Sequence, residues 1–368
     1  MNARRIRQAR TGMSLVEFMV VISVLGLILS LLLPAIQSAR ETGRRTRCLN
    51  NLRSQGQAIL QFEQMHSRLP SAGEGTDITQ NPPATALEMQ SLYTKLLDYL
   101  EEDYTVEPMN FDLAYNDDAW PQNQTAAKTS IVPYLCPSNA IRIADPDRYG
   151  LTDYMPVVYT DIDPVTGIRN PATRMDGGFR LGGTPVAKVL DGMSRTVAIF
   201  EDAGRAFETI FPNTVSQYAD PVFSGGSAPV WNGTSQVTYA QWCASKGMTS
   251  GGLPAGDTPT PSGRRVMNRW AEPACAGGIS GQPNSTQGNW IDPINGNSLP
   301  TGGPPNCPWS QTNCGPNEEP WSWHQKGSNV LMFDGAARFI GSRIDPRVLR
   351  KLVTADEQEP YGDNLVPE

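Results

Sequence analysis

Residues 12–36, GMSLVEFMVVISVLGLILSLLLPAI, decide the fold of this 368-residue chain because they form one long apolar run. From residue 13 onward the run carries a single charge, that of Glu17. A helix rises about 1.5 Å per residue, so residues 13–36 would span roughly 36 Å, enough to cross a bilayer. Four arginines and no acid precede the run, at Arg4, Arg5, Arg7 and Arg10. The positive-inside rule therefore predicts a single-pass helix with its N-terminus in the cytoplasm.

Three interpretations of this run differ in whether they account for its length and for Glu17. A secretory signal peptide has an apolar region of about 7–15 residues that ends at a small-residue cleavage site. This run is longer, and Gln37-Ser38-Ala39 fits such a site poorly. A plain membrane anchor explains the length and the orientation. It leaves Glu17 unexplained, because a charged carboxylate inside a span costs about 2.5–3.5 kcal/mol or more without a partner.

The residues around Glu17 resemble the type IV prepilin signature: a short basic leader, a Gly, one further residue, then Ser/Thr-Leu-Val/Ile-Glu and an apolar helix. Here the signature reads Gly12-Met13-Ser14-Leu15-Val16-Glu17, with Met13 where Phe is usual. The resemblance implies that a prepilin peptidase cuts after Gly12 and methylates the new N-terminus at Met13. Glu17 becomes the fifth residue of the mature chain, and Pro34 falls where many pilins carry a helix-kinking proline.

The same resemblance, to type IV prepilins and type II secretion pseudopilins, implies partners and a location. The partners are the prepilin peptidase/methyltransferase, other pilin-like subunits and an inner-membrane assembly platform. Glu17 would pair with the N-terminal amine of a neighbouring subunit and set the axial register while both charges stay out of lipid. The chain would cross the inner membrane once, with its head periplasmic, or extracellular after assembly.

Composition excludes several other classes of protein. The net charge of −7 argues against a nucleic-acid-binding protein, which would show a basic field. His66 and His324 are the only histidines, so a multi-histidine metal centre is ruled out. The chain contains no Gly-x-Ser-x-Gly nucleophile elbow. We therefore expect a non-enzymatic protein without a metal site or cofactor.

Hydrophobic periodicity predicts an α+β chain. One helix is expected over residues 14–66, kinked near Pro34, and a second over residues 84–102. Strands are expected at 154–160 and 196–201. A hairpin over residues 329–340 would turn at Asp334-Gly335 with type I′ geometry. A closing helix at 345–355 would be capped by Asp345.

The expected architecture is pilin-like, a long helix packed on an antiparallel head. Its predicted parts are a basic leader (1–12), an assembly helix (13–36), its continuation (37–67), a globular head (68–355) and a tail (356–368). Within the head, residues 221–320 are rich in Gly, Pro, Trp and Cys and lack periodicity. We expect this stretch to be an ordered, loop-rich insertion.

Several further segments resemble a large planctomycete-type family of pilin-like proteins of uncharacterised function. Its C-terminal His-x9-Asp-Gly signature reads here His324, Asp334 and Gly335. The other matching segments are Cys48-Leu-Asn50-Asn51-Leu52, Leu135-Cys136-Pro137-Ser138, the stretch 191–196 and Glu201-Asp202-Ala203-Gly204-Arg205. The resemblance implies processing, topology and a pilin-like fold. We interpret the His324 signature as structural, with the histidine bracing the hairpin, although a catalytic or metal-binding pair is an alternative.

Six cysteines in a translocated domain indicate disulfides rather than metal. Pairing Cys48 with Cys136 would tie the long helix to the head, and Cys307 with Cys314 would close a small loop and leave Cys243 with Cys275. Fifteen pairings are possible, and the sequence alone does not choose between them. A zinc site from Cys307, Cys314 and His324 is disfavoured.

Two ligand-binding alternatives remain open. The acid pairs Asp145/Asp147 and Asp161/Asp163 would bind calcium as in some pseudopilins, although neither matches an EF-hand loop. The tryptophans of the insertion would stack on a glycan or a protein surface. In that alternative the chain is a membrane-anchored binding module that uses its helix only as an anchor.

Overall fold

The computed structural model describes residues 15–77, 84–100, 107–117, 120–139, 142, 145, 147–203, 229–248, 268–281, 292–295, 320–324 and 326–357. The chain divides into two compact units, residues 1–44 and residues 45–368. The predicted leader with Gly12 and Met13, and the cysteines Cys307 and Cys314, lie outside the described residues.

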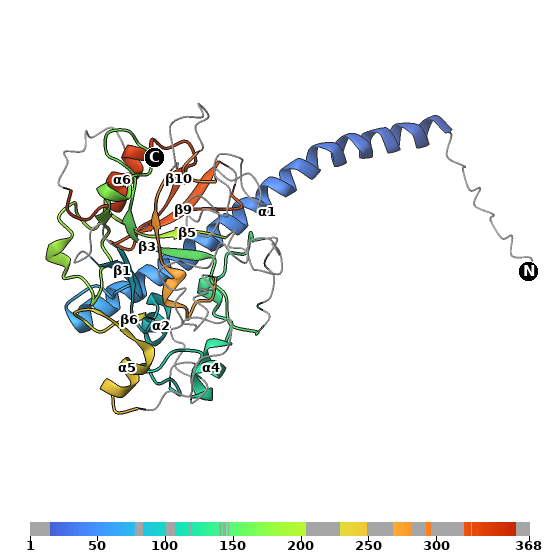
Figure 1. Ribbon diagram of the computed structural model, residues 1–368. Helices are drawn as coiled ribbons and strands as arrows, with labels where there is room; N and C mark the ends of the chain where they lie inside the picture. Colours follow the sequence, from blue (N-terminus) through green and yellow to red (C-terminus); the bar gives the residue numbers. More distant parts are fainter. Residues whose placement is uncertain are drawn as a thin grey trace, which may run out of the picture. The chain divides into compact units, whose positions relative to one another are not determined.

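The predicted long helix is present as α1 (Leu15–His66), which Figure 1 shows as a single ribbon. Pro34 lies inside this helix. Its first part is exposed along its length, and the large apolar side chains from Leu15 to Ile36 are 46–72% accessible. Its last part is buried on one face, where Cys48, Leu52, Gln55, Gly56, Ala58 and Ile59 pack into the second unit. One helix thus joins an apolar segment to the core of the head.

The head is built on a six-stranded sheet in the order β10-β9-β5-β3-β4, with β8 paired beside β3. Its strands are β3 (Tyr154–Thr160), β4 (Met175–Asp176), β5 (Val197–Glu201), β8 (Gly277–Ile279), β9 (Gly327–Met332) and β10 (Ala337–Gly341). The β3–β8 pair is parallel, and the other pairs are antiparallel. The α+β class and the strands predicted at 154–160 and 196–201 are confirmed.

Helices cover both faces of this sheet. Because alternate residues of a strand point to opposite faces, one strand contributes side chains to two separate cores. On β3, Tyr154 and Val158 pack in the core that contains the buried face of α1. Met155 and Val157 instead pack with α6 (Pro346–Val353). The predicted cap of α6 is confirmed, since the Asp345 side chain accepts a hydrogen bond from Arg347 N–H.

Two small hairpins and three short helices complete the described fold. The hairpins are β1 (Glu74–Asp77) with β2 (Ala84–Leu87), and β6 (Pro229–Trp231) with β7 (Gln236–Thr238). The helices are α2 (Leu92–Leu96), α4 (Pro121–Ala127) and α5 (Tyr239–Ser245), and short 3₁₀ turns connect several elements. Part of the stretch 221–320 belongs to the main fold, because β8 extends the sheet and Trp270 is fully buried in the main core.

The single helix predicted over residues 84–102 is wrong. Residues 84–87 instead form a strand, because the β1–β2 ladder pairs Glu74 with Leu87. The helix begins only at Leu92, after Ser91, whose side chain accepts from Thr94 N–H. The Ser91 hydroxyl also donates to Trp270 O. A tertiary ladder and a buried cap therefore override the apolar spacing of this segment.

The predicted hairpin is confirmed, but its type I′ turn is wrong. A type I′ turn needs positive φ at both central residues, and here Gly335 has φ +85° whereas Asp334 does not have positive φ. Gly335 N–H donates to Met332 O, and Met332 N–H donates to Ala336 O. The loop is therefore the three-residue kind that ends in a left-handed glycine.

Candidate functional site

The first candidate site is the exposed apolar surface of α1. Within the described residues, α1 is the helix long and apolar enough to cross a membrane, and none of its most apolar stretch is buried inside the protein. Large exposed apolar surfaces mark contacts with lipid or with partner proteins. Glu17 and Pro34 both lie in this segment, in the first turn and in the interior of the helix.

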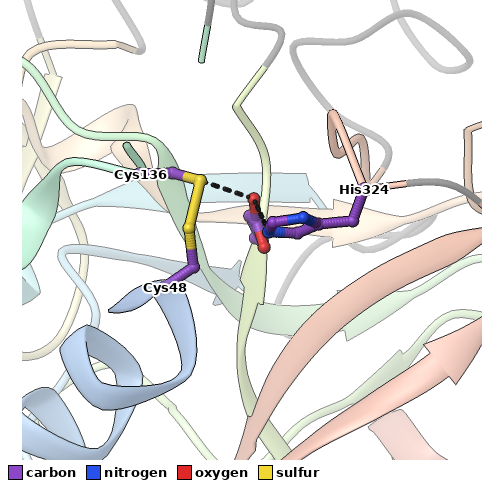
Figure 2. Close-up of side chains that lie close together, drawn as sticks. Cys48, Cys136 and His324 are labelled. Carbon is purple, nitrogen blue, oxygen red and sulfur yellow. Dashed lines mark hydrogen bonds and ion pairs between the residues drawn. A yellow bond between two sulfur atoms is a disulfide. The ribbon is translucent and has the colours of Figure 1, made fainter. Parts of the chain in front are cut away.

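The second candidate site is a buried cluster in the head. Cys48 from α1 and Cys136 form a disulfide with their Cα atoms 5.2 Å apart. Glu201 at the end of β5 and His324 just before β9 lie against it, as Figure 2 shows for His324. Cys136 Sγ is 2.9 Å from Glu201 Oε1, and His324 Nε2 is 3.4 Å from the same oxygen. All four side chains are buried.

Strand alternation explains why Glu201 points into this cluster. On β5, Phe200 packs toward α6, so Glu201 points to the opposite face, toward α1. Asn329 on the neighbouring β9 donates from Nδ2 to Glu201 Oε2 at 2.7 Å. Burial raises the pKa of Glu201 to about 8, against the lowering effect of the Asn329 hydrogen bond. The carboxyl is therefore mostly protonated at neutral pH.

Hydrogen bonds hold the Cys136 segment in place on both sides. Cys136 N–H donates to Asp153 Oδ2 at 2.7 Å, and Arg142 pairs with the same carboxylate. From α1, the Asn51 side chain donates to Leu135 O at 2.8 Å, and the Gln55 side chain donates to Pro133 O at 2.7 Å. These contacts fix the segment against the helix independently of the disulfide.

The disulfide confirms that Cys48 and Cys136 tie the long helix to the head. The two cysteines are 88 residues apart in the chain, and removing a native disulfide typically costs about 2–5 kcal/mol. The pair Cys243–Cys275 is not formed. Cys243 packs beside Tyr239 of α5, whereas Cys275 lies in the main core with Trp270, so the fold separates the two sulfurs.

His324 and Asp334 are not brought together. They lie at opposite ends of β9, whose six residues span roughly 20 Å at about 3.3 Å per residue. Asp334 accepts from Ala336 N–H, and its own N–H donates to Met193 O. Gly335 lies against α1, since its Cα would be 3.0 Å from a Cβ at Gly56. Asp334 and Gly335 thus shape the turn, and His324 belongs to the disulfide cluster instead.

Three of the four acids considered for calcium contact arginines in the part of the chain that the structure describes. Arg269 is within 2.6 Å of Asp145 and 2.9 Å of Asp147. Asp161 pairs with Arg174 at 2.7 Å. Asp163 accepts from the backbone N–H groups of the turn that follows it, which lowers its pKa to about 2.

The described tryptophans of the insertion are packed rather than presented on a surface. Trp270 is fully buried and donates to Thr129 O. Trp231 and Trp242 are half-buried, and Trp242 donates to Asp112 O. Trp290 and Trp309 lie outside the described residues. Binding of a glycan or protein by the insertion stays a prediction.

Glu201 is the member of the cluster that sequence reasoning missed as a site residue. Its signal was an acid that directly follows the apolar strand residues Val197–Phe200. Four segments that are far apart in the sequence thus converge, and they carry Cys48, Cys136, Glu201 and His324. Only the tertiary pairing of β5 with β9, and of α1 with the sheet, brings them together.

Comparison with known proteins supports a pilin-like relationship. Residues 37–347, well over half of the chain, match the family described as "Protein of unknown function (DUF1559)", and the chain belongs to that family. It is also similar to the type II secretion system core protein G of Aeromonas hydrophila, with 27% identity over 85 residues. Those residues are 23% of this chain and span 59% of the length of that relative. No solved structure matches the chain.

Proposed function

We propose that the chain is a non-enzymatic, pilin-like subunit that assembles through its N-terminal helix into a type IV pilus or a pseudopilus-like fibre. The observation that carries the proposal is the exposed apolar part of α1, continuous with a helix that is anchored in the head. The similarity to a type II secretion core protein supports it. An apolar surface of this extent needs lipid before assembly and other helices afterwards.

In this proposal a prepilin peptidase removes residues 1–12 and methylates Met13, and the chain crosses the inner membrane once. Glu17 then lies near the new N-terminus, where it pairs with the terminal amine of a neighbouring subunit. Such a pair sets register because an unpaired carboxylate in an apolar environment is costly. An assembly platform in the inner membrane supplies subunits to the fibre, and the head faces the periplasm or the exterior.

Intact-mass and N-terminal peptide analysis of the protein from native membranes tests this proposal. The expected N-terminal peptide begins with N-methylated Met13, and the intact mass lacks residues 1–12. Gly12→Leu, which changes the residue before the cut, should accumulate as uncleaved precursor in the membrane. A mature chain that keeps Met1, or one cut beyond residue 36, contradicts the proposal and favours a plain anchor or a secreted binding module.

A further inference from the structure

The disulfide cluster carries chemistry that fibre assembly does not use. Its four side chains offer two sulfurs, one carboxylate oxygen and one imidazole nitrogen, and these atoms all lie within 4.8 Å of one another. They come from α1, the segment before β3, the end of β5 and the segment before β9. A disulfide does not by itself require a buried carboxyl and a buried imidazole beside it.

We propose that Cys48, Cys136, Glu201 and His324 bind one divalent ion of the zinc class when the two cysteines are thiols. The disulfide is then the metal-free state of the same site. This is a different donor set from the Cys307, Cys314 and His324 combination that the sequence disfavoured. The proposal is independent of fibre assembly.

The donor set fits a tetrahedral zinc ion, although the sulfurs must move apart, and away from Glu201, once the disulfide is reduced. Structural zinc sites take four ligands, drawn from thiolate, imidazole and carboxylate. With Zn–S of about 2.3 Å and Zn–N or Zn–O of about 2.0 Å, the ligand atoms lie roughly 3.3–3.8 Å apart. Glu201 Oε1 is 3.4 Å from His324 Nε2 and 2.9 Å from Cys136 Sγ. Small side-chain movements would place the four atoms around one ion.

The surroundings orient these donors as the outer shell of a metal site does. Asn329 holds Glu201 Oε2, which leaves Oε1 directed to the sulfur and the imidazole. Tyr154 Oη donates to Cys48 O at 3.3 Å. His324 N–H donates to Ser322 Oγ at 3.1 Å, which fixes the backbone of the histidine.

The metal-bound state and the disulfide state differ by two electrons, by protons and by the bound ion. The chain is synthesised with both cysteines as thiols. The metal competes for this pair with an external disulfide, which takes up the two electrons and two protons as the Cys48–Cys136 bond forms. When the ion binds, both thiols lose their protons, and Glu201 also loses its proton if it is protonated. Starting from the disulfide, a water-soluble phosphine supplies two electrons to the sulfur–sulfur bond. The phosphine becomes phosphine oxide with oxygen from water, and the two sulfurs take up the two protons.

Cobalt(II) binding to the full-length chain in detergent tests the proposal. The protein is unfolded in urea with the phosphine, because the cluster is buried, and is refolded without oxygen in the presence of Co²⁺. We expect one Co²⁺ per chain, a thiolate-to-cobalt charge-transfer absorption and the intense visible bands of tetrahedral cobalt. Zn²⁺ should displace the cobalt and abolish the spectrum. The oxidised chain should show no thiolate-to-cobalt band.

Single-ligand variants assign the site. Cys48→Ser and Cys136→Ser each remove one of the two thiolates, so each should lose at least half of the charge-transfer absorption. His324→Asn should weaken Co²⁺ binding by at least tenfold. Glu201→Gln keeps the size of the side chain and its contact with Asn329, so it should fold and still bind more weakly. Cys243→Ser is the matched control, a buried cysteine from a different cluster, and should keep the wild-type spectrum. Refolded wild type that binds no Co²⁺, or an unchanged charge-transfer band in Cys136→Ser, would overturn the proposal.

Discussion

At the scale of single residues, Glu88 shows how the fold supplies partners to a buried charged group. Glu88 accepts hydrogen bonds from Ser71 Oγ and from Lys95 Nζ, the latter at 2.8 Å, and from Gly182 N–H. Burial by itself raises the pKa of Glu88, but the charge of Lys95 and the three hydrogen bonds outweigh it and the pKa is lowered. Ionised Glu88 is therefore more stable in the folded chain than in the unfolded one.

The pH dependence of stability follows from this lowered pKa. The unfolded chain binds the proton more readily, so the contribution of Glu88 is fully present above the unfolded pKa near 4.5. It is lost as the pH falls through the lower, folded pKa. Glu88→Gln should lower the free energy of unfolding at pH 7 by about 1–3 kcal/mol and flatten its decline in acid. Urea unfolding from pH 7 to acid measures both quantities.

A double-mutant cycle with Lys95→Gln provides the control. Because the two side chains interact directly, the loss in the double variant should be smaller than the sum of the two single losses. A Glu88→Gln protein with the wild-type acid decline would show that the ion pair does not govern this part of the pH profile.

At the scale of elements, glycines on α1 show how a helix is fitted to a sheet. A Cβ at Gly56 would lie 2.8 Å from Leu331 Cδ1 and 3.0 Å from Gly335 Cα, whereas a Cβ at Gly43 would meet nothing within 4 Å. By helix propensity alone, glycine weakens the helix equally at both positions. The packing of the β9–β10 turn on the helix makes Gly56 a contact and leaves Gly43 as a solvent-facing position.

This contrast predicts opposite effects of the same substitution. Gly56→Ala should destabilise the head by about 1–3 kcal/mol, because the backbone at Gly335 cannot yield as a flexible side chain can. Gly43→Ala should cause no loss and add up to about 1 kcal/mol of local helix stability. Urea unfolding of the full-length chain in detergent compares the two variants. Equal effects at the two positions would contradict the packing argument.

At the scale of the whole molecule, the two parts of α1 lie in different environments. Its first part is apolar and exposed, and its last part is a buried component of the head. The disulfide and the hydrogen bonds from Asn51 and Gln55 hold that last part to the segment before β3. A covalent link therefore holds the last part of α1 to the head in addition to its packing.

The proposed role of Glu17 is tested by assembly rather than by insertion. Glu17→Ala should enter the membrane as well as wild type and yield at least tenfold less protein in sheared fibres, because the register pair is missing. Glu41→Ala is the matched control on the same helix. Its carboxylate pairs with Arg44 three residues away, beyond the apolar segment, so assembly should be unchanged. Normal fibres from Glu17→Ala would show that the register argument is wrong.

The sequence by itself determined the features that depend on local pattern. The long helix, the strands at β3 and β5, the hairpin and the Asp345 cap follow from apolar spacing, turn residues and capping chemistry, all of which act over a few residues. The helix expected over residues 84–102 is wrong because apolar spacing within the segment reveals neither its pairing with β1 nor its contact with Trp270.

Only the tertiary structure decided which distant residues meet. The Cys48–Cys136 pair, one of fifteen pairings open to the sequence, follows from packing α1 against the sheet. Pairing of β5 with β9 then puts Glu201 beside Asn329, and His324 joins them while Asp334 stays at the far end of the strand. The physical reason is that strand alternation and register fix which side chains share a face, and register is set by packing across the whole core.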